Sequence, residues 1–216
     1  MDELASLRSN FIQRNEHYYN EIISFINFNI RVDSSVLEVG CGTGFVLNKL
    51  KTKKKYGIDI SKKMLRVGKK NYPDIVFKEI DAHELSKLKR TFDYIIISDL
   101  LPLLQDVQKT LERLHTICTP RTRLIITYHS NLWRPVLAVA TLLGRRSPDP
   151  SYNWLSTSDI KNLLQLAGFE SITQCGYTLL PVKLPGLNWL MNRFLAKMPL
   201  FNHLCLTWRI VARPVP

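Results

Sequence analysis

The stretch Val36-Leu-Glu-Val-Gly-Cys-Gly-Thr-Gly-Phe45 decides the fold of this chain. It begins as a short apolar strand, ends in glycines at positions 40, 42 and 44, and continues into a helical run from Phe45 to Leu50. Because glycine has no Cβ, the backbone can turn sharply here and come close to a ligand. The first N–H groups of the following helix can bind the same ligand. The stretch therefore predicts a nucleotide-type binding corner.

Strands and helices alternate on either side of this corner. Apolar runs typical of strands occupy residues 36–39, 56–60, 75–80, 92–98 and 123–128, and helical spacing appears at residues 62–71 and 105–117. This alternation predicts an α/β fold, in which a mostly parallel sheet has helices on both faces. The run Tyr94-Ile-Ile-Ile97 is typical of a strand that is buried on both faces.

Further segments surround the alternating part. Residues 3–30 have apolar residues at helical spacing and are expected to pack over the glycine corner. Beyond residue 128 we expect apolar helical segments at 132–144 and 187–198, and strands at 172–178 and 204–212. Ser156 and Asp159 resemble a capping box that starts a helix ending at Gly168. We expect a single domain over residues 1–216, with a helical cover at 1–30 and additions at 131–155 and 179–203.

The composition indicates a globular protein with a basic surface. The chain has 216 residues, 45% of them hydrophobic, and a net charge of +12. This charge is compatible with an anionic partner (nucleic acid, an anionic membrane face or a phosphorylated substrate) and equally with a lysine-rich surface without a partner. The four cysteines lack metal-ligand spacing, so we expect no metal, and reduced thiols in a cytoplasmic protein. We find no signal-peptide pattern and no apolar run long enough to span a membrane.

Three acidic residues are expected at one edge of the sheet. Glu38 lies within the first strand, Asp59 ends the second and Asp81 follows the third. The carboxyl ends of parallel strands meet at one edge, beside the glycine corner. A carboxylate at Asp59 can accept hydrogen bonds from both hydroxyls of a ribose, and one at Asp81 can accept a bond from an adenine amine. Phe45 occupies the place of the third glycine of a dinucleotide motif, and no Gly-Lys-Ser/Thr follows, which weakens the dinucleotide interpretation and excludes a P-loop.

Four segments together resemble the ordered motifs of class I S-adenosylmethionine-dependent methyltransferases. They are residues 36–44, Gly57-Ile-Asp-Ile-Ser61, Asp81-Ala-His-Glu-Leu85 and Phe92-Asp-Tyr-Ile-Ile-Ile97. The resemblance covers about residues 15 to 130 and implies a Rossmann-like three-layer sandwich, with a seven-stranded sheet whose last strand is antiparallel. The tail resembles a branch of this superfamily that is found alone or beside glycosyltransferase-like domains, on the segments His129-Ser-Asn-Leu-Trp133, Asn153-Trp-Leu-Ser156 and 205–214.

This resemblance implies S-adenosylmethionine as cofactor and S-adenosylhomocysteine as product. By the same match, the glycine turn binds the methionine part, Asp59 the ribose and Asp81 the adenine amine. The residues so implied at the cofactor are Glu38, Gly40, Cys41, Gly42, Gly44, Asp59, Ile60, Met64, Asp81, Ala82, Ser98 and Leu100.

The reaction is an SN2 displacement, in which the enzyme mainly aligns the nucleophile with the activated methyl group. A base is needed when the acceptor is an unionised hydroxyl or amine. His129 is the first candidate, because a neutral imidazole can accept a proton near pH 7; the alternative is a histidine that is hydrogen-bonded in a loop. Tyr128 and Asp99 are weaker candidates. The segment Ser98-Asp-Leu-Leu-Pro102 lacks the Asn/Asp-Pro-Pro-Tyr/Phe signature of methyltransferases that modify nucleic-acid amino groups or glutamine.

The additions are expected to choose the acceptor, and the candidate substrate or lid residues are Tyr18, Tyr19, Trp133, Asn153 and Trp154. The apolar segments with basic flanks can form a lid over an apolar or lipid-linked substrate, dock on the anionic inner face of a membrane, or simply cover the sheet edge. We favour a methyltransferase acting on a small, lipid-linked or glycan-related acceptor. An RNA methyltransferase and a non-catalytic protein that binds S-adenosylmethionine remain the alternatives.

Overall fold

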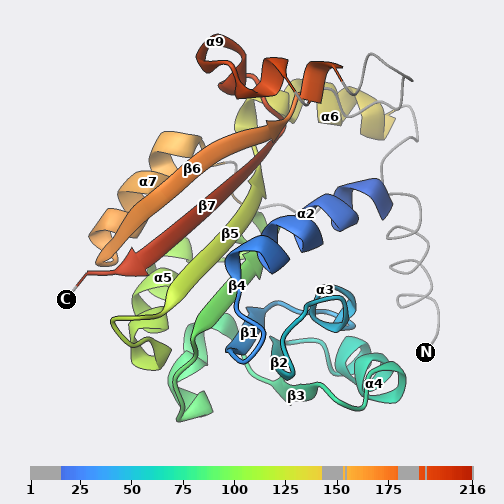
Figure 1. Cartoon of the computed structure of the whole chain (residues 1–216), viewed down its shortest axis with the longest axis vertical. Helices are drawn as coiled ribbons and strands as arrows, with labels where there is room; N and C mark the ends of the chain where they lie inside the picture. Colours follow the sequence, from blue (N-terminus) through green and yellow to red (C-terminus); the bar gives the residue numbers. More distant parts are fainter. Residues whose placement is uncertain (1–15, 143–152, 154, 180–189, 193, 216) are drawn as a thin grey trace.

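A single seven-stranded sheet forms the centre of the molecule (Figure 1). The structure is a computed structural model that describes residues 16–142, 153, 155–179, 190–192 and 194–215. The strand order is β3-β2-β1-β4-β5-β7-β6, and β7 is antiparallel to both of its neighbours while the other pairs are parallel. The expected Rossmann-like α/β fold with an antiparallel last strand is thereby confirmed. The strands are β1 (Ser35–Val39), β2 (Lys54–Asp59), β3 (Val76–Glu79), β4 (Tyr94–Ser98), β5 (Arg123–His129), β6 (Phe169–Thr178) and β7 (Thr207–Pro214).

The sheet separates two apolar layers, as the period-two alternation of strand side chains requires. On one face, Val36, Ile96 and Ile125 pack with residues of the helices that precede or follow the glycine turn. On the other face, Leu37 and Ile97 pack with residues of the later helices. The first set of helices is α2 (Glu16–Asn29), α3 (Phe45–Asn48) and α4 (Lys62–Asn71), and the second is α5 (Val107–Leu114) and α7 (Thr157–Leu166).

Side-chain caps explain where several helices begin. The Ser61 side chain accepts the backbone N–H of Met64 at the start of α4, and Asp106 accepts that of Lys109 at the start of α5. The predicted capping box of Ser156 and Asp159 is confirmed, with both reciprocal hydrogen bonds present. Each cap satisfies N–H groups that have no partner inside the helix. These helices therefore start at positions that their own sequences specify.

Several predicted boundaries differ from the structure. In place of the helix expected over 105–117, the structure has α5 followed by a 3-10 turn, η3 (His115–Ile117). α5 starts later than expected because Asp106 caps it, one residue after the expected start. The segment expected over 132–144 begins as a 3-10 turn, η4 (Asn131–Trp133), and continues as α6 (Arg134–Leu142). The last strand begins at Thr207 instead of residue 204, since residues 199–206 form α9 (Pro199–Asn202) and a turn.

The apolar run expected as one helix over 187–198 is interrupted in the part that the structure describes. Residues 190–192 are helical, a 3-10 turn η5 (Leu195–Lys197) follows, and Met198 has the extended backbone of a helix-capping residue before α9. Residues 3–15 of the predicted N-terminal helix, and Trp154, lie outside the described residues. Among the helices of the described ranges, we find none whose length and apolar character would let it cross a membrane.

The central strand should dominate stability. Ile96 is fully buried and pairs with Glu38 of β1 and Ile125 of β5. We expect Ile96→Ala to lower the free energy of unfolding by about 2–5 kcal/mol, because it leaves a cavity where the structure cannot collapse. Urea titration followed by circular dichroism measures this loss. Val76→Ala, on the half-exposed edge strand β3, serves as control and should cost less than about 1 kcal/mol; equal losses would contradict the placement of the core.

Candidate functional site

The glycine turn sits where the chain order of the sheet reverses, between β1 and β4. Gly40, Gly42 and Gly44 all have positive φ, at 72°, 55° and 79°. A Cβ on Gly44 would lie 2.5 Å from the Phe77 ring, whereas a Cβ on Gly42 would meet nothing within 4 Å. The turn is thus packed against the protein at Gly44 and open at Gly42. Ligands of doubly wound sheets bind at such a switch point, so this open side is the candidate binding site.

Asp59, at the end of β2, holds the turn in place. Its Oδ2 accepts the backbone N–H of Gly42 at 2.8 Å, and its Oδ1 accepts that of Ser61 at 2.8 Å. A carboxylate oxygen can accept more than one hydrogen bond, so both oxygens retain acceptor capacity for a ligand. The residue predicted to bind a ribose therefore also joins the glycine turn to the start of α4.

Asp81 and Ala82 lie at the start of η1 (Ala82–Leu88), after β3. Asp81 accepts the backbone N–H of His83 at 2.8 Å, and its Oδ1 lies 2.7 Å from His83 Nδ1. The N–H of His83 is the main cause that lowers the pKa of Asp81, so this carboxyl remains an acceptor. Ile60 is exposed, and Met64 is partly buried on α4. Asp81 and Ile60 follow the neighbouring strands β3 and β2 at one edge of the sheet, where the resemblance to the family expects the adenine end of the cofactor.

The inner end of the site is a cavity of about 30 Å³. Glu38 and Cys41 line it and are buried, and burial raises the pKa of the Cys41 thiol, which stays protonated. The Ser98 hydroxyl, also at this cavity, is buried and has no hydrogen-bond partner among the described residues. Leu100 packs next to Gly40, 2.7 Å from where a Cβ would be. A polar ligand group fits this place, because it would satisfy the buried hydroxyl.

Asp99 follows β4 and contacts three side chains from other parts of the chain. Tyr18 Oη donates to Asp99 Oδ2 at 2.6 Å, and Thr127 Oγ1 lies 3.4 Å from Oδ1. His129 Nδ1 is 3.8 Å from the same Oδ1, and its ring stacks on that of Tyr18 with centroids 5.4 Å apart. Burial is the main cause that raises the pKa of Tyr18, and the negative charge of Asp99 is the next. The Tyr18 hydroxyl therefore remains a neutral donor.

The backbone of Asp99 is itself unusual, with φ at 52°. A non-glycine residue in this region carries strain, which persists where surrounding contacts compensate and is common at functional sites. Thr127 and His129 lie on the same face of β5, two residues apart, and this face is the one that α2 covers. Asp99 also lines the cavity beside the glycine turn. The Tyr18–Asp99–Thr127–His129 cluster therefore lies directly next to the candidate cofactor site.

The remaining predicted residues have other places. Tyr128 points to the opposite face of the sheet and is fully buried in the layer of α5 and α7, so the structure does not bring it to the site. Tyr19 lines the cavity as part of the core and packs edge-on against Phe45. Trp133 Nε1 donates to the carbonyl of Leu204 at 2.8 Å, and the Asn153 side chain donates to the carbonyl of Leu104. Both side chains therefore donate hydrogen bonds to backbone carbonyls of the protein itself.

Sequence reasoning missed Thr127 and Phe45 as site residues. Phe45 lines the cavity from the first position of α3, and Thr127 contacts Asp99. A period-two count back from His129 along its strand would have indicated Thr127. In contrast, the edge-on contact of Phe45 with Tyr19 depends on how α2 crosses the sheet, and no local pattern indicates it.

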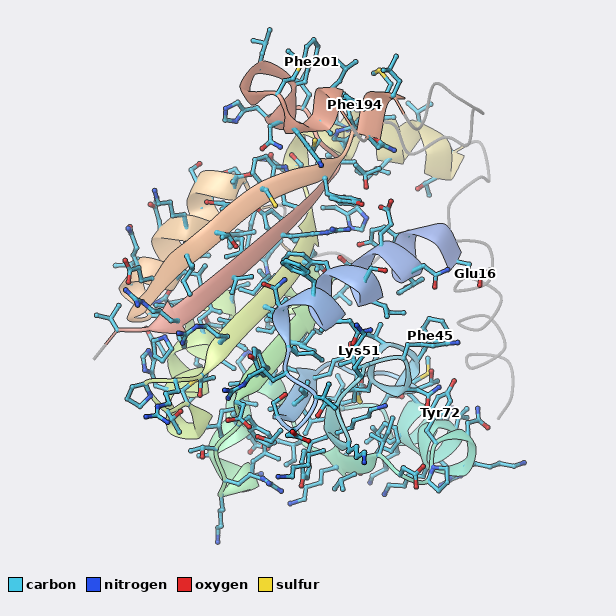
Figure 2. All side chains as sticks on the ribbon, in the orientation of Figure 1. Glu16, Phe45, Lys51, Tyr72, Phe194 and Phe201 are labelled. Atoms are coloured by element: carbon cyan, nitrogen blue, oxygen red, sulfur yellow. The ribbon has the colours of Figure 1, made fainter. Side chains whose placement is uncertain are left out.

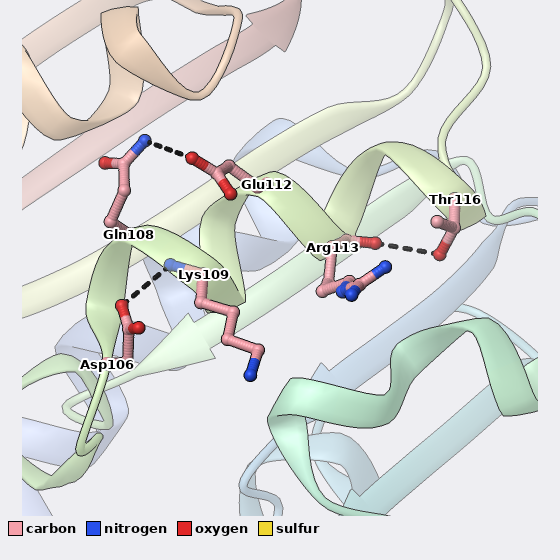
Figure 3. Close-up of a pocket in the computed structure, with 6 residues that line it drawn as sticks. All are labelled: Asp106, Gln108, Lys109, Glu112, Arg113 and Thr116. Atoms are coloured by element: carbon pink, nitrogen blue, oxygen red, sulfur yellow. Dashed lines mark hydrogen bonds between the residues drawn. The ribbon is translucent and has the colours of Figure 1, made fainter.

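A second, wider hollow of about 580 Å³ lies along the outer side of α5 (Figure 3). Asp106, Gln108 and Glu112 line it, and each of them already takes part in a hydrogen bond of the helix or its cap. The hollow is an open helix surface on the layer opposite the glycine turn. We therefore do not assign it to catalysis. Within the described residues, no three His, Cys, Asp or Glu side chains are grouped as a metal ion would require.

Comparison with known proteins agrees with this geometry. A family model described as "Methyltransferase domain" matches residues 11–174. The demethylmenaquinone methyltransferase of Oceanobacillus iheyensis is 25% identical over 179 residues, 69% of this chain and 75% of that relative. The enzyme of the same name from Streptomyces avermitilis is 38% identical over 93 residues, 43% of this chain and 40% of the relative.

Solved structures share the fold. A SAM-dependent methyltransferase of Thermotoga maritima superposes with a TM-score of 0.74 at 15% identity, over 98% of this chain and 96% of that one. Magnesium protoporphyrin IX methyltransferase of Synechocystis, with bound SAH, superposes with a TM-score of 0.63 at 16% identity, over 94% of this chain and 87% of that one. Because the family model covers most of the chain and the fold is shared with solved SAM-dependent methyltransferases, the chain belongs to the methyltransferase-domain family and is a class I, S-adenosylmethionine-dependent methyltransferase.

Proposed function

We propose that this enzyme methylates a small apolar acceptor of the quinone class, in its reduced, hydroxyl-bearing form. The observation that carries the proposal is the Tyr18–Asp99–Thr127–His129 cluster, which borders the cofactor cavity at Asp99. Its groups can hold a ring hydroxyl and accept its proton. The relatives from Oceanobacillus and Streptomyces, which are named for demethylmenaquinone, support a quinone acceptor.

The cofactor residues are inferred from the resemblance to the family motifs, and their positions around the glycine turn support the inference. In this proposal the turn of Gly40, Cys41, Gly42 and Gly44 holds the methionine part, with Glu38 beneath it, and Asp59 accepts the ribose hydroxyls. Asp81 accepts the adenine amine, while Ile60, Met64 and Ala82 contact the ring, and Ser98 and Leu100 lie beside the sulfonium. When bound, the cofactor would supply an activated methyl group: its bond to the sulfonium sulfur would break as a bond forms to the ionised hydroxyl oxygen, or to the ring carbon that this oxygen activates and that then loses its hydrogen as a proton, and the neutral thioether S-adenosylhomocysteine would remain.

His129 acts as general base in this proposal. Its imidazole accepts the proton of the acceptor hydroxyl, and Asp99, held by Tyr18 and Thr127, stabilises the resulting imidazolium. The 3.8 Å separation of His129 from Asp99 is longer than a hydrogen bond, and catalytic contacts of this kind commonly shorten when substrate binds. The stacked Tyr18 ring keeps the imidazole in one orientation.

An apolar surface lies near the acceptor side and supports an apolar substrate. We define the apolar cap as the exposed apolar side chains of η4, α6, η5, α9 and their neighbours. Its first element, η4, starts two residues after His129. α6, α9 and the labelled Phe194 and Phe201 lie at one end of the molecule (Figures 1 and 2). The exposed members are Leu132, Val136, Val139, Leu142, Leu190, Phe194, Met198, Leu200 and Leu204. With Lys197 beside it, the cap is suited to contact with an anionic membrane face from which the acceptor enters.

Replacing Asp59 tests the cofactor site. We expect Asp59→Ala to weaken S-adenosylmethionine binding by more than about 1 kcal/mol, because a charged hydrogen bond to ribose and the tether of the turn are both lost. Isothermal titration calorimetry measures the dissociation constant. Asp74→Ala, an exposed carboxylate before β3, is the matched control and should bind as the wild type does. An unchanged dissociation constant in Asp59→Ala would rule out the assignment.

Methyl transfer to a quinol tests the reaction. Purified protein, methyl-labelled S-adenosylmethionine and chemically reduced demethylmenaquinone in detergent should give labelled product in the lipid extract. We expect His129→Gln to lower kcat by about 100-fold or more while cofactor affinity stays unchanged, since a general base contributes at least that much. His203→Gln, an exposed histidine next to the last strand, should keep the wild-type kcat. Label that appears in RNA from a cell extract, and none in quinol, would refute the proposal.

Vesicle flotation tests the membrane contact. At low salt, the protein should float with vesicles that contain phosphatidylglycerol and stay unbound with neutral vesicles, because the basic surface adds to apolar insertion. Leu142→Glu combined with Leu200→Glu, at side chains that are 87% and 78% exposed on the cap, should abolish flotation. Phe28→Glu, at an 88% exposed side chain on α2 outside the cap, should float normally. If wild type and variants behave alike, the cap does not bind membranes.

A further inference from the structure

Arg209 is a buried cation on the face of the sheet that α2 covers. It lies on β7, is 6% exposed, and pairs with Thr127 of β5 on one side and Cys175 of β6 on the other. A buried guanidinium costs free energy unless its surroundings compensate for the lost water. Burial lowers the pKa of Arg209, and Tyr177, Glu21 and Cys175 act in the opposite direction. These neighbours therefore keep the side chain charged.

The contacts of Arg209 join α2 to the far strand of the sheet. Its guanidinium carbon lies 3.4 Å from the ring centroid of Tyr177, on β6, and 5.0 Å from that of Phe25, on α2. Its Nη2 is 3.9 Å from Oε2 of Glu21, also on α2. A planar guanidinium between two rings is attracted to the face of each. Arg209 thus bridges the helix and the strand with its charge and its flat shape.

The same helix carries the side chains that close the methyl-transfer site. Tyr18 lies three residues before Glu21 and seven before Phe25, so the three side chains are on one face of α2. The Tyr18 hydroxyl is 2.6 Å from Asp99, and Arg209 is among the charges that act on it. The contacts with Arg209, one and two turns later, therefore restrict where Tyr18 lies over Asp99 and His129.

We propose that Arg209 is a positioning residue: it clamps α2 onto β6 and so keeps Tyr18 and Tyr19 in place over the cofactor cavity and the base. An arginine is suited to this role because it combines charge for Glu21 with a flat surface for two rings. A lysine would keep the charge and lose the stacking, and a methionine would keep the length and lose both. The kinetic consequence rests on the proposed function, whereas the clamping of α2 does not.

Hydrogen exchange of the purified protein, without any acceptor, tests the clamp directly. In Arg209→Met, we expect the amides of residues 16–29 to exchange about tenfold faster or more, because local opening of α2 becomes easier, while those of β1 are unchanged. Arg209→Lys should lie between this variant and wild type. Arg213→Met is the matched control, since Arg213 lies on the same face of the same strand and forms a 2.7 Å ion pair with Glu170. Its α2 amides should exchange as in wild type.

Kinetics with the quinol acceptor form the second arm. Arg209→Met should lower kcat by about tenfold or more through displaced Tyr18, with Arg209→Lys partly restoring it and Arg213→Met unaffected. If Arg209→Met does not fold, Phe25→Leu releases the clamp from the side of the helix and should speed exchange in the same residues. Exchange within twofold of wild type in both variants would overturn the proposal. A wild type that does not methylate quinol would refute the acceptor assignment alone, because the exchange arm is independent of it.

Discussion

The two hydrogen bonds that Asp59 accepts, from Gly42 and from Ser61, connect the parts on which the site depends. A carboxylate at the end of β2 joins the glycine turn after β1 to the first turn of α4. The turn can take its shape because its three glycines adopt positive φ, and Gly44 leaves room for Phe77. The binding corner is therefore held by a charged side chain in addition to its backbone geometry.

The polar cluster beside the glycine turn is assembled from segments that are far apart in the chain. α2 contributes Tyr18 before the first strand, β4 and β5 contribute Asp99 and His129, and β7 contributes Arg209 near the C-terminus. All four lie on the face of the sheet that α2 covers. They form a polar cluster at the edge of the apolar layer on that face. The positive φ of Asp99 is a local strain that the contacts with Tyr18 and Thr127 offset.

The two sides of the active site follow different physical requirements. The cofactor side needs backbone N–H groups, acidic strand ends and close packing of glycine. For the proposed reaction, the acceptor side needs a base that is held in one orientation, and cover that admits an apolar ring. Tyr18 and His129 stack on each other, and an exposed apolar cap starts directly after β5, which supports the proposed acceptor. In this proposal, methyl transfer depends on how well α2 aligns the two sides.

Most of the fold could be predicted from residues alone. Period-two apolar runs, glycines at alternate positions and the Ser156–Asp159 box are local signals, since each acts within a few residues. They predicted the sheet and the helix that starts at Ser156, whereas the cofactor class came from the resemblance of four segments to a known family. The segment 187–198 was predicted less well, because a continuous apolar spacing does not reveal a break such as the one at Met198.

The sequence by itself therefore determined the glycine turn and the edge of the sheet at which Asp59 and Asp81 lie, because the ends of parallel strands share an edge. The tertiary structure alone decided which polar residues act together. It brought Tyr18 to Asp99 across 81 positions and buried Arg209 under α2. Such contacts depend on how a helix crosses a twisted sheet, and this crossing is set by packing between segments that are far apart in the chain.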